Sequence, residues 1–188
     1  SYLRRALRIA EEHPDATWEM IENSLLSIGD YYVLAGRPNR ASKTYEDTWE
    51  FLTEGNDPAR LQARADHLEK PKVLQRVFPP KYYNSERSEA DQAPDSFEKG
   101  TSSFMFIISP SGRVSNLRHI ETQPVGLSEF STVIGRSVRR LVYRPRMENA
   151  VTVATPETIY THEFFYRPAD VPKPPPEPES VTEASTEQ

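Results

Sequence analysis

The sequence predicts an α+β fold in which N-terminal helical hairpins precede a small antiparallel β-sheet. Apolar residues recur at the helical period of 3.6 through residues 1–70. After residue 103, β-prone segments and one amphipathic helix follow in the order strand, strand, helix, strand. The predicted division is a helical region at 1–70, a linker and long polar loop at 71–103, a ββαβ domain at 104–168 and a tail at 169–188.

Composition and motifs disfavour several classes of function. The 188 residues carry 23 basic and 28 acidic side chains, and a net charge of −5 argues against a broad nucleic-acid-binding surface. The chain contains no cysteine, which removes disulfides, thiol nucleophiles and cysteine-ligated zinc. It has no nucleotide-binding or hydrolase motif, so we expect a protein that is not an enzyme and needs no cofactor. His119 and His162 fall on predicted strands, but no carboxylate stands at ligand spacing on both, so we expect no metal site.

The helical region contains a repeat. Leu25, Ile28 and Tyr32 define one helical face, on which Gly29 is expected to let a partner helix approach closely. The segment Gly36-Arg37-Pro38 ends this helix, and Asp57-Pro58 begins a later one. The apolar positions of 3–10 recur 42 residues later, a spacing typical of stacked helical hairpins.

These positions resemble a tetratricopeptide repeat of the longer, kinesin-light-chain type. The resemblance rests on Leu25, Ile28, Gly29, Tyr32, Gly36, Ala41, Tyr45 and Thr48. About one and a half repeats are present, and roughly three are needed for a stable stack, so we expect more repeats upstream of Ser1. The aromatic residues of this region either pack the hairpins or line a peptide-binding groove: Trp18, Tyr31, Tyr32, Tyr45 and Trp49.

The C-terminal module begins with a strand at 104–108 that is apolar on both faces. Such a strand must be covered on both sides, either within one chain or across a homodimer. The turn at 109–112 leads to a second strand at 113–120, with a bulge expected near Ser115 or Asn116. An amphipathic helix and a third strand at 158–166 complete the module. The helix has its apolar stripe at Leu127, Phe130, Ile134, Val138 and Leu141.

This order resembles the C-terminal domain of the TonB energy-transducer family. The matching segments are the turn and strand at 109–117 and the helix end at 138–145, whose last residues are Tyr143-Arg144-Pro145. The segment at 78–83 resembles the family's proline- and tyrosine-containing segment upstream of the domain, with its order changed. The stretch from Met147 to Glu157 departs from the family because it lacks the glycine-rich turn.

We expect partners at two places in the module. A three-stranded sheet leaves edges with unpaired backbone groups, so the third strand is the candidate protein-binding site. Its residues are Thr158, Tyr160, His162, Phe164 and Tyr166. A basic cluster at the helix end is either a solvated helix face or a patch for an anionic partner. It comprises Arg136, Arg139, Arg140 and Arg144.

The resemblance implies a protein of the Gram-negative periplasm, anchored through an upstream segment, that contacts the membrane indirectly. The acidic composition and the lack of a recognisable binding motif predict no nucleic-acid partner. Its partner would be an outer-membrane transporter or its periplasmic peptide segment, taken up by strand addition during energy-dependent transport. The alternative is a periplasmic scaffold or adaptor whose repeats bind one partner and whose TonB-like domain binds another, without energy transduction. The proline-rich tail, which includes Pro174-Pro175-Pro176, is predicted to be disordered, with a docking motif as the alternative.

Overall fold

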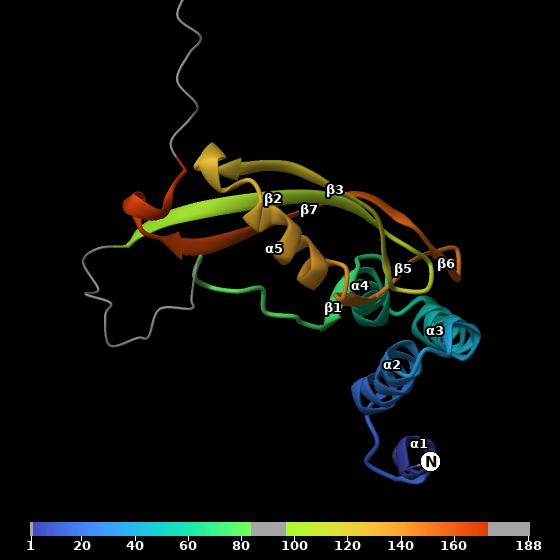
Figure 1. Ribbon diagram of the computed structural model, residues 1–188. Coiled ribbons are helices and arrows are strands. Elements are labelled where there is room, and N and C mark those ends of the chain that lie inside the picture. The colour runs from blue at the N-terminus through green and yellow to red at the C-terminus, as the bar shows by residue number, and fades with distance from the viewer. Residues whose placement is uncertain (1, 84–96, 173–188) are drawn as a thin grey trace, which may run out of the picture.

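The computed structural model describes residues 2–83 and 97–172, and it has the α+β architecture that the sequence predicts (Figure 1). The helical part comprises α1 (Tyr2–Glu12), α2 (Trp18–Leu34), α3 (Pro38–Thr53), the 3-10 turn η1 (Glu54–Asn56) and α4 (Pro58–His67). The remaining elements are β1 (Lys72–Gln75), β2 (Glu98–Ile108), β3 (Val114–Gln123), η4 (Val125–Leu127), α5 (Phe130–Val138), β4 (Val142–Arg144), β5 (Arg146–Glu148), β6 (Val151–Val153), β7 (Thr155–Tyr166) and η5 (Pro168–Asp170). The tail predicted to be disordered from residue 169 lies outside the described residues from residue 173 onward. Its first residues are ordered, because the 3-10 turn η5 reaches Asp170 and Val171 packs against the core.

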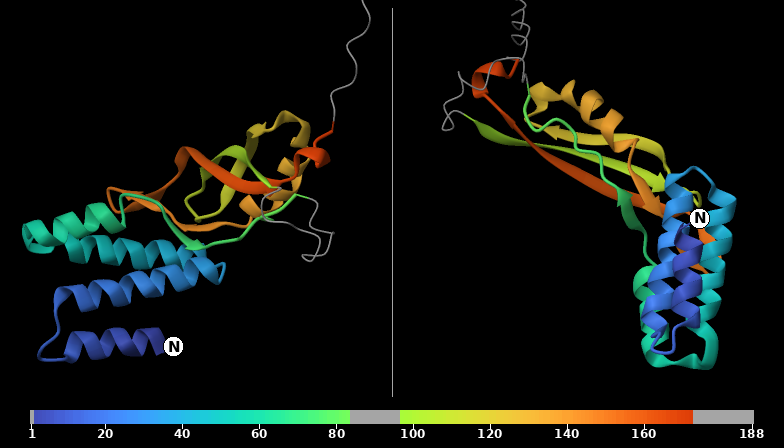
Figure 2. Two further views of the ribbon diagram at one scale, coloured as in Figure 1. Left: turned by 90° about the vertical axis from the view of Figure 1, so that its left-hand side faces the viewer. Right: turned by 90° about the horizontal axis from the view of Figure 1, so that it is seen from below.

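The helices stack side by side as antiparallel neighbours, as Figure 2 shows. The close approach predicted at Gly29 is confirmed, because a Cβ built there would lie 2.3 Å from Cε1 of Tyr45 on α3. The predicted cap of α4 is also confirmed, since Oδ1 of Asp57 accepts a hydrogen bond from the Ala59 amide at 2.8 Å. Tyr45 is fully buried between the helices, so it is a packing residue.

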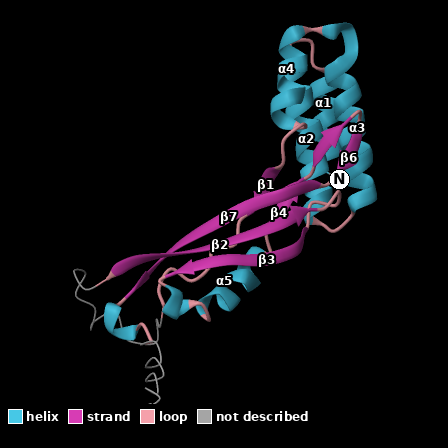
Figure 3. Ribbon diagram, turned by 90° about the horizontal axis from the view of Figure 1, so that it is seen from above, coloured by secondary structure: helices cyan, strands magenta, loops and turns pink. Residues whose placement is uncertain are grey.

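The main sheet has the strand order β3-β2-β7, and all pairs are antiparallel. The turn predicted at 109–112 joins β2 to β3, where the Ser109 amide donates to the Arg113 carbonyl at 2.9 Å. The bulge predicted near Ser115 or Asn116 is confirmed by a register shift between Met105 and Ile107, which pair with Arg118 and Ser115. Helix α5 packs against one face of the sheet, where its apolar stripe meets Phe104, Phe106 and Ile108 (Figure 3).

Three predicted boundaries were wrong. The loop predicted to run to residue 103 ends by Glu98, because β2 extends to residue 98 through a polar stretch in which the Ser102 and Thr122 hydroxyls hydrogen-bond at 2.9 Å. The linker contains β1, which pairs with β4 about 70 residues later. The third strand begins at Thr155, and the short β5–β6 hairpin precedes it.

The strand predicted to need cover on both faces has one face in the core and one that is half-buried. Phe104, Phe106 and Ile108 are buried under α5, whereas Met105 and Ile107 lie on the opposite face. A homodimer that covers this second face stays a prediction.

The helices and the sheet are joined through a shared hydrophobic cluster. Val142 and Met147, both fully buried, pack with residues of α2, α3 and α4. Arg144 crosses the same junction, and its guanidinium forms a bidentate pair with Asp30 of α2 at 2.8 and 2.6 Å. Its third nitrogen donates to the His67 carbonyl at 3.0 Å. The helical stack therefore lies at one end of the sheet and is fixed there (Figure 3).

Candidate functional site

The five predicted binding residues of β7 lie on the inner face of the sheet. Phe164 is fully buried and Tyr166 is 8% exposed, and both belong to the core under α5. Thr158, Tyr160 and His162 are half-buried on the same face. Side chains alternate between the two faces of a strand, and this alternation correctly predicted that the five residues share a face. That face points to the core, so Phe164 and Tyr166 are not exposed to a partner.

What β7 does offer is its backbone edge. The Phe165 amide donates to the Lys81 carbonyl at 2.8 Å, and the Phe165 carbonyl accepts from the Tyr83 amide at 2.9 Å. Both groups of Phe165 thus face away from β2. Because backbone groups alternate along an antiparallel strand, the backbone groups of Ile159, Thr161 and Glu163 face away from β2 as well.

Among the described residues, the chain itself occupies this edge at one end. Tyr82 forms a parallel bridge to Phe165, and the His162 ring hydrogen-bonds the Pro80 carbonyl at 2.9 Å. Pairing along the edge cannot continue from there, since Pro79 and Pro80 have no amide hydrogen to donate. Within 2–83 and 97–172, no strand pairs with the outer edge of β7 between Ile159 and Glu163.

A cavity of about 550 Å³ lies beside this free edge, between β7 and the segment that follows β1. Its walls are mainly apolar, with Val77, Pro79, Leu141, Tyr143 and Tyr160 among the lining residues. Burial raises the pKa of the Tyr143 and Tyr160 hydroxyls, which therefore stay neutral at physiological pH. Arg76 and Lys81 supply positive charge at the same cavity.

The opposite edge of the sheet is less suited to pairing. Strand β3 has two register shifts against β2, and Asn116 has a left-handed backbone with φ of 50°. Strand β7 keeps one register from Tyr166 to Thr158, and its irregularity comes only beyond that point. Since bulges disrupt the regular spacing of donors and acceptors, β7 is the better template for an added strand.

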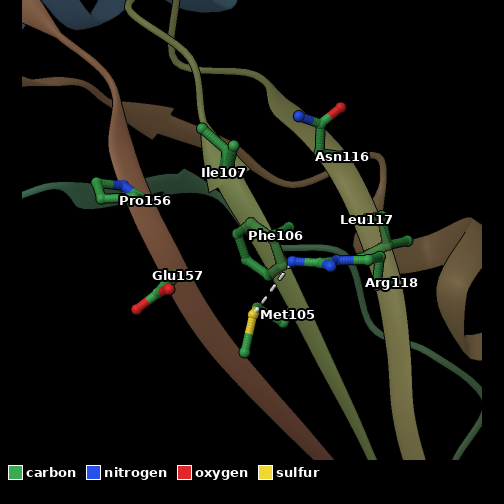
Figure 4. Close-up of a pocket in the computed structure, with 8 residues that line it drawn as sticks. All are labelled: Met105, Phe106, Ile107, Asn116, Leu117, Arg118, Pro156 and Glu157. Atoms are coloured by element: carbon green, nitrogen blue, oxygen red, sulfur yellow. Dashed lines mark hydrogen bonds between the residues drawn. The ribbon is translucent and has the colours of Figure 1, made fainter.

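A second cavity, of about 580 Å³, lies at the bulged ends of β2, β3 and β7 (Figure 4). Met105 and Ile107 line it, and the Arg118 guanidinium lies 3.8 Å from the Met105 sulfur. Pro156 and Glu157 border it from β7. It belongs to the half-buried face of the sheet and does not include the backbone edge at 159–163.

The predicted basic cluster divides into two parts. Arg136, Arg139 and Arg140 are exposed on and just after α5. Arg144 is only 2% exposed and is paired with Asp30, so its inclusion in an anion-binding patch was wrong. Sequence reasoning missed this because Asp30 lies 114 positions earlier in the chain.

The two strand histidines are not arranged as a metal site. His119 hydrogen-bonds the Thr122 hydroxyl at 2.7 Å, while His162 contacts the Pro80 carbonyl. The part of the chain that the structure describes holds no group of three or more metal-ligating side chains. Across the same residues, every helix is too short or too polar to cross a bilayer.

Comparison with known proteins gives no match, either to a protein family or to a curated protein. The candidate site therefore rests on its own geometry. Sequence reasoning missed Ile159, Thr161 and Glu163, which carry the free backbone groups. The signal was present, because these residues alternate with Phe164 along the predicted strand. It also missed Val77 and Leu141, which come from segments distant in sequence.

Proposed function

We propose that this protein is a non-enzymatic binding module that takes up an extended segment of a partner protein on the outer edge of β7. The observation that carries the proposal is the regular, free backbone edge at Ile159–Glu163 beside an apolar cavity. In strand addition the main chain supplies hydrogen bonds, and alternate side chains supply selectivity.

The cavity defines the chemistry of the segment. Side chains of an added strand that point to the inner face share that face with Tyr160 and His162, and so enter the cavity. An aliphatic or aromatic side chain suits its walls. A carboxylate one or two positions away suits Lys81 and Arg76. The preferred ligand is therefore an extended segment with an apolar anchor and an acidic neighbour.

The cellular setting follows from the resemblance to the TonB family. On this resemblance, the proposed location is the periplasm of a Gram-negative bacterium, and the proposed partner is an outer-membrane transporter with an extended periplasmic segment. Energy-dependent transport is the process that this partner implies. The rigid junction between helices and sheet supports a role in which both parts act together, because Arg144 and Asp30 tie them directly.

A second candidate function is a periplasmic scaffold or adaptor. Helix α2 presents exposed apolar side chains at Met20, Tyr31 and Leu34, which provide a surface for a different partner. In this alternative the repeats and the TonB-like domain each bind one protein, and no energy is transduced.

A titration of the ¹⁵N-labelled chain with synthetic peptides from the amino-terminal periplasmic segments of outer-membrane transporters tests the proposal. We expect shifts at the Ile159, Thr161 and Glu163 amides, and none with a control peptide that is N-methylated at alternate residues. Shifts confined to α2 would favour the scaffold. Unchanged β7 amides with every peptide would contradict strand addition.

A further inference from the structure

A second groove lies between α5 and β3, away from the β7 edge and independent of the proposed function. It encloses about 400 Å³. Its floor is apolar, formed by Phe104, Leu117 and Gly135, and its rim carries His119, Arg136 and Arg139. The floor depends on Gly135, because a Cβ at this position would lie 3.3 Å from Cε1 of Phe104.

The cations at this groove have no anionic partner in the protein as described. Across residues 2–83 and 97–172, neither Arg136 nor Arg139 forms a salt bridge. Both side chains are exposed, Arg136 in the last turn of α5 and Arg139 directly after the helix. A groove with an apolar floor and unpaired cations on its rim suits a segment that carries carboxylates and small apolar or proline residues.

The C-terminal end of this chain has that composition. Residues 173–188 contain four glutamates, Glu177, Glu179, Glu183 and Glu187, and one lysine, so that the net charge of this stretch is −3. The run Pro174-Pro175-Pro176 precedes the first two glutamates, which alternate with Pro178. The basic groove and the acidic segment therefore have complementary charges.

The point where the described chain ends puts this segment within reach of the groove. Val171 and Pro172 pack against Gly126 of η4, the element that directly precedes α5. A proline-rich segment extends by about 3.1 Å per residue, so a chain of this composition can carry Glu177 and Glu179 up to about 16 and 22 Å from Pro172. A helix rises by about 1.5 Å per residue, so Arg136 lies about 9 Å along α5 from its first residue, Phe130, which is shorter than the length that this segment can span.

From these lengths and charges, we infer that the groove between α5 and β3 is the docking site for the acidic C-terminal segment of the same chain. Glu177 and Glu179 pair with Arg136 and Arg139, and the intervening prolines cover the apolar floor. Docking is electrostatic in large part, so it weakens as salt shortens the Debye length from about 10 Å at 0.1 M to about 3 Å at 1 M. An acidic partner protein that uses this groove has to displace the segment.

Paramagnetic broadening tests this inference on the full chain. Because the sequence has no cysteine, Ser180→Cys gives a single site for a nitroxide label. We expect loss of amide signal at Gly135 and Arg136 in the labelled protein. The loss should be reversed by Glu177→Gln with Glu179→Gln, and retained in the matched control Glu183→Gln with Glu187→Gln.

Changes in the groove give the reciprocal test. Arg136→Glu with Arg139→Glu should restore the signal of Gly135, whereas Arg118→Glu, an exposed arginine of β3 outside the groove, should not. Broadening at Gly135 that is unchanged by either double variant would overturn the inference. Broadening in a mixture of unlabelled ¹⁵N chain and nitroxide-labelled ¹⁴N chain would also overturn it, because the segment would then come from a second copy.

Discussion

Arg144 shows how one buried charge fixes the relation between two parts of the protein. Its guanidinium satisfies three hydrogen bonds, two to the Asp30 carboxylate and one to the His67 carbonyl. The Tyr45 hydroxyl donates to the same carboxylate at 2.8 Å. Burial, together with the nearby Asp30 charge, raises the pKa of Tyr45, which therefore stays a neutral donor. Asp30 is the shared acceptor of this network, so its removal leaves the Arg144 charge and the Tyr45 hydroxyl buried without their carboxylate partner.

We predict that Asp30→Ala lowers the free energy of unfolding by about 3 kcal/mol, because it leaves the Arg144 charge buried without its counter-ion. Urea denaturation followed by circular dichroism measures the change. Lys43→Ala is the matched control, since its pairs with Glu46 and Asp47 are exposed, and we expect its loss to change the free energy of unfolding little. Equal effects of the two substitutions would show that the Arg144 network does not stabilise the fold.

Short elements here depend on backbone conformations that their residues do not favour. The β5–β6 hairpin turns through Asn149 and Ala150, whose φ angles are 49° and 64°. Two left-handed residues are the requirement of a type I′ turn, for which Asn-Gly is the preferred pair. Ala150 therefore carries a steric cost that glycine would remove.

Ala150→Gly should stabilise the protein by about 1 kcal/mol, because the relief of the left-handed conformation exceeds the entropy that glycine adds to the unfolded chain. Thermal unfolding measures the shift in Tm. The same change at Ala63, inside α4, should instead destabilise by about 1 kcal/mol. A fall in Tm for Ala150→Gly would contradict the turn described at these residues.

Elements with local signals could be predicted from the sequence, and elements defined by distant partners could not. The face formed by Ile28, Gly29 and Tyr32 and the cap at Asp57 are visible in a single stretch of chain. Strand β1 has only four residues, and it exists because β4 pairs with it. The polar start of β2 likewise depends on its flanking strands, since Ser102 pairs with Thr122 and Ser103 with Thr161.

The candidate site follows the same rule. Alternation along β7 predicted which side chains share a face, but the position of α5 decides that this face is the core. The free edge depends on where the segment around Tyr82 stops pairing with β7, and Pro79 and Pro80 determine that point. The parallel bridge to Phe165 could not be inferred from either segment alone.

At the scale of the whole molecule, the helices and the sheet form one structure. The helical cluster includes Val142 and Met147 from the C-terminal module, and the Met147 amide donates to the Leu68 carbonyl at 2.7 Å. The Ser42 and Thr152 hydroxyls connect α3 to β6 at 3.3 Å. The short strands β4 and β5 of the C-terminal module therefore rely on the helices for their core.

A fragment of residues 97–172 should not fold cooperatively by itself, because it lacks β1 and exposes Val142 and Met147. We expect poorly dispersed amide signals and a broad thermal transition, whereas the full chain should give a single sharp transition. A well-dispersed spectrum with a sharp transition for the fragment would show that the shared cluster is dispensable.

The account as a whole depends on the outer edge of β7 accepting a strand, and Thr161→Pro tests this most directly. The Thr161 amide faces away from β2, so proline there removes no backbone hydrogen bond within the sheet, although it does remove the exposed hydroxyl contact with Ser103. It blocks backbone pairing with an added strand. Calorimetry with a transporter-derived peptide that shifts the β7 amides measures the effect. We predict that the Kd rises by about tenfold or more, corresponding to about 1.4 kcal/mol, with the circular dichroism spectrum unchanged. A folded Thr161→Pro variant that binds the peptide as tightly as the unaltered chain would contradict binding at this edge.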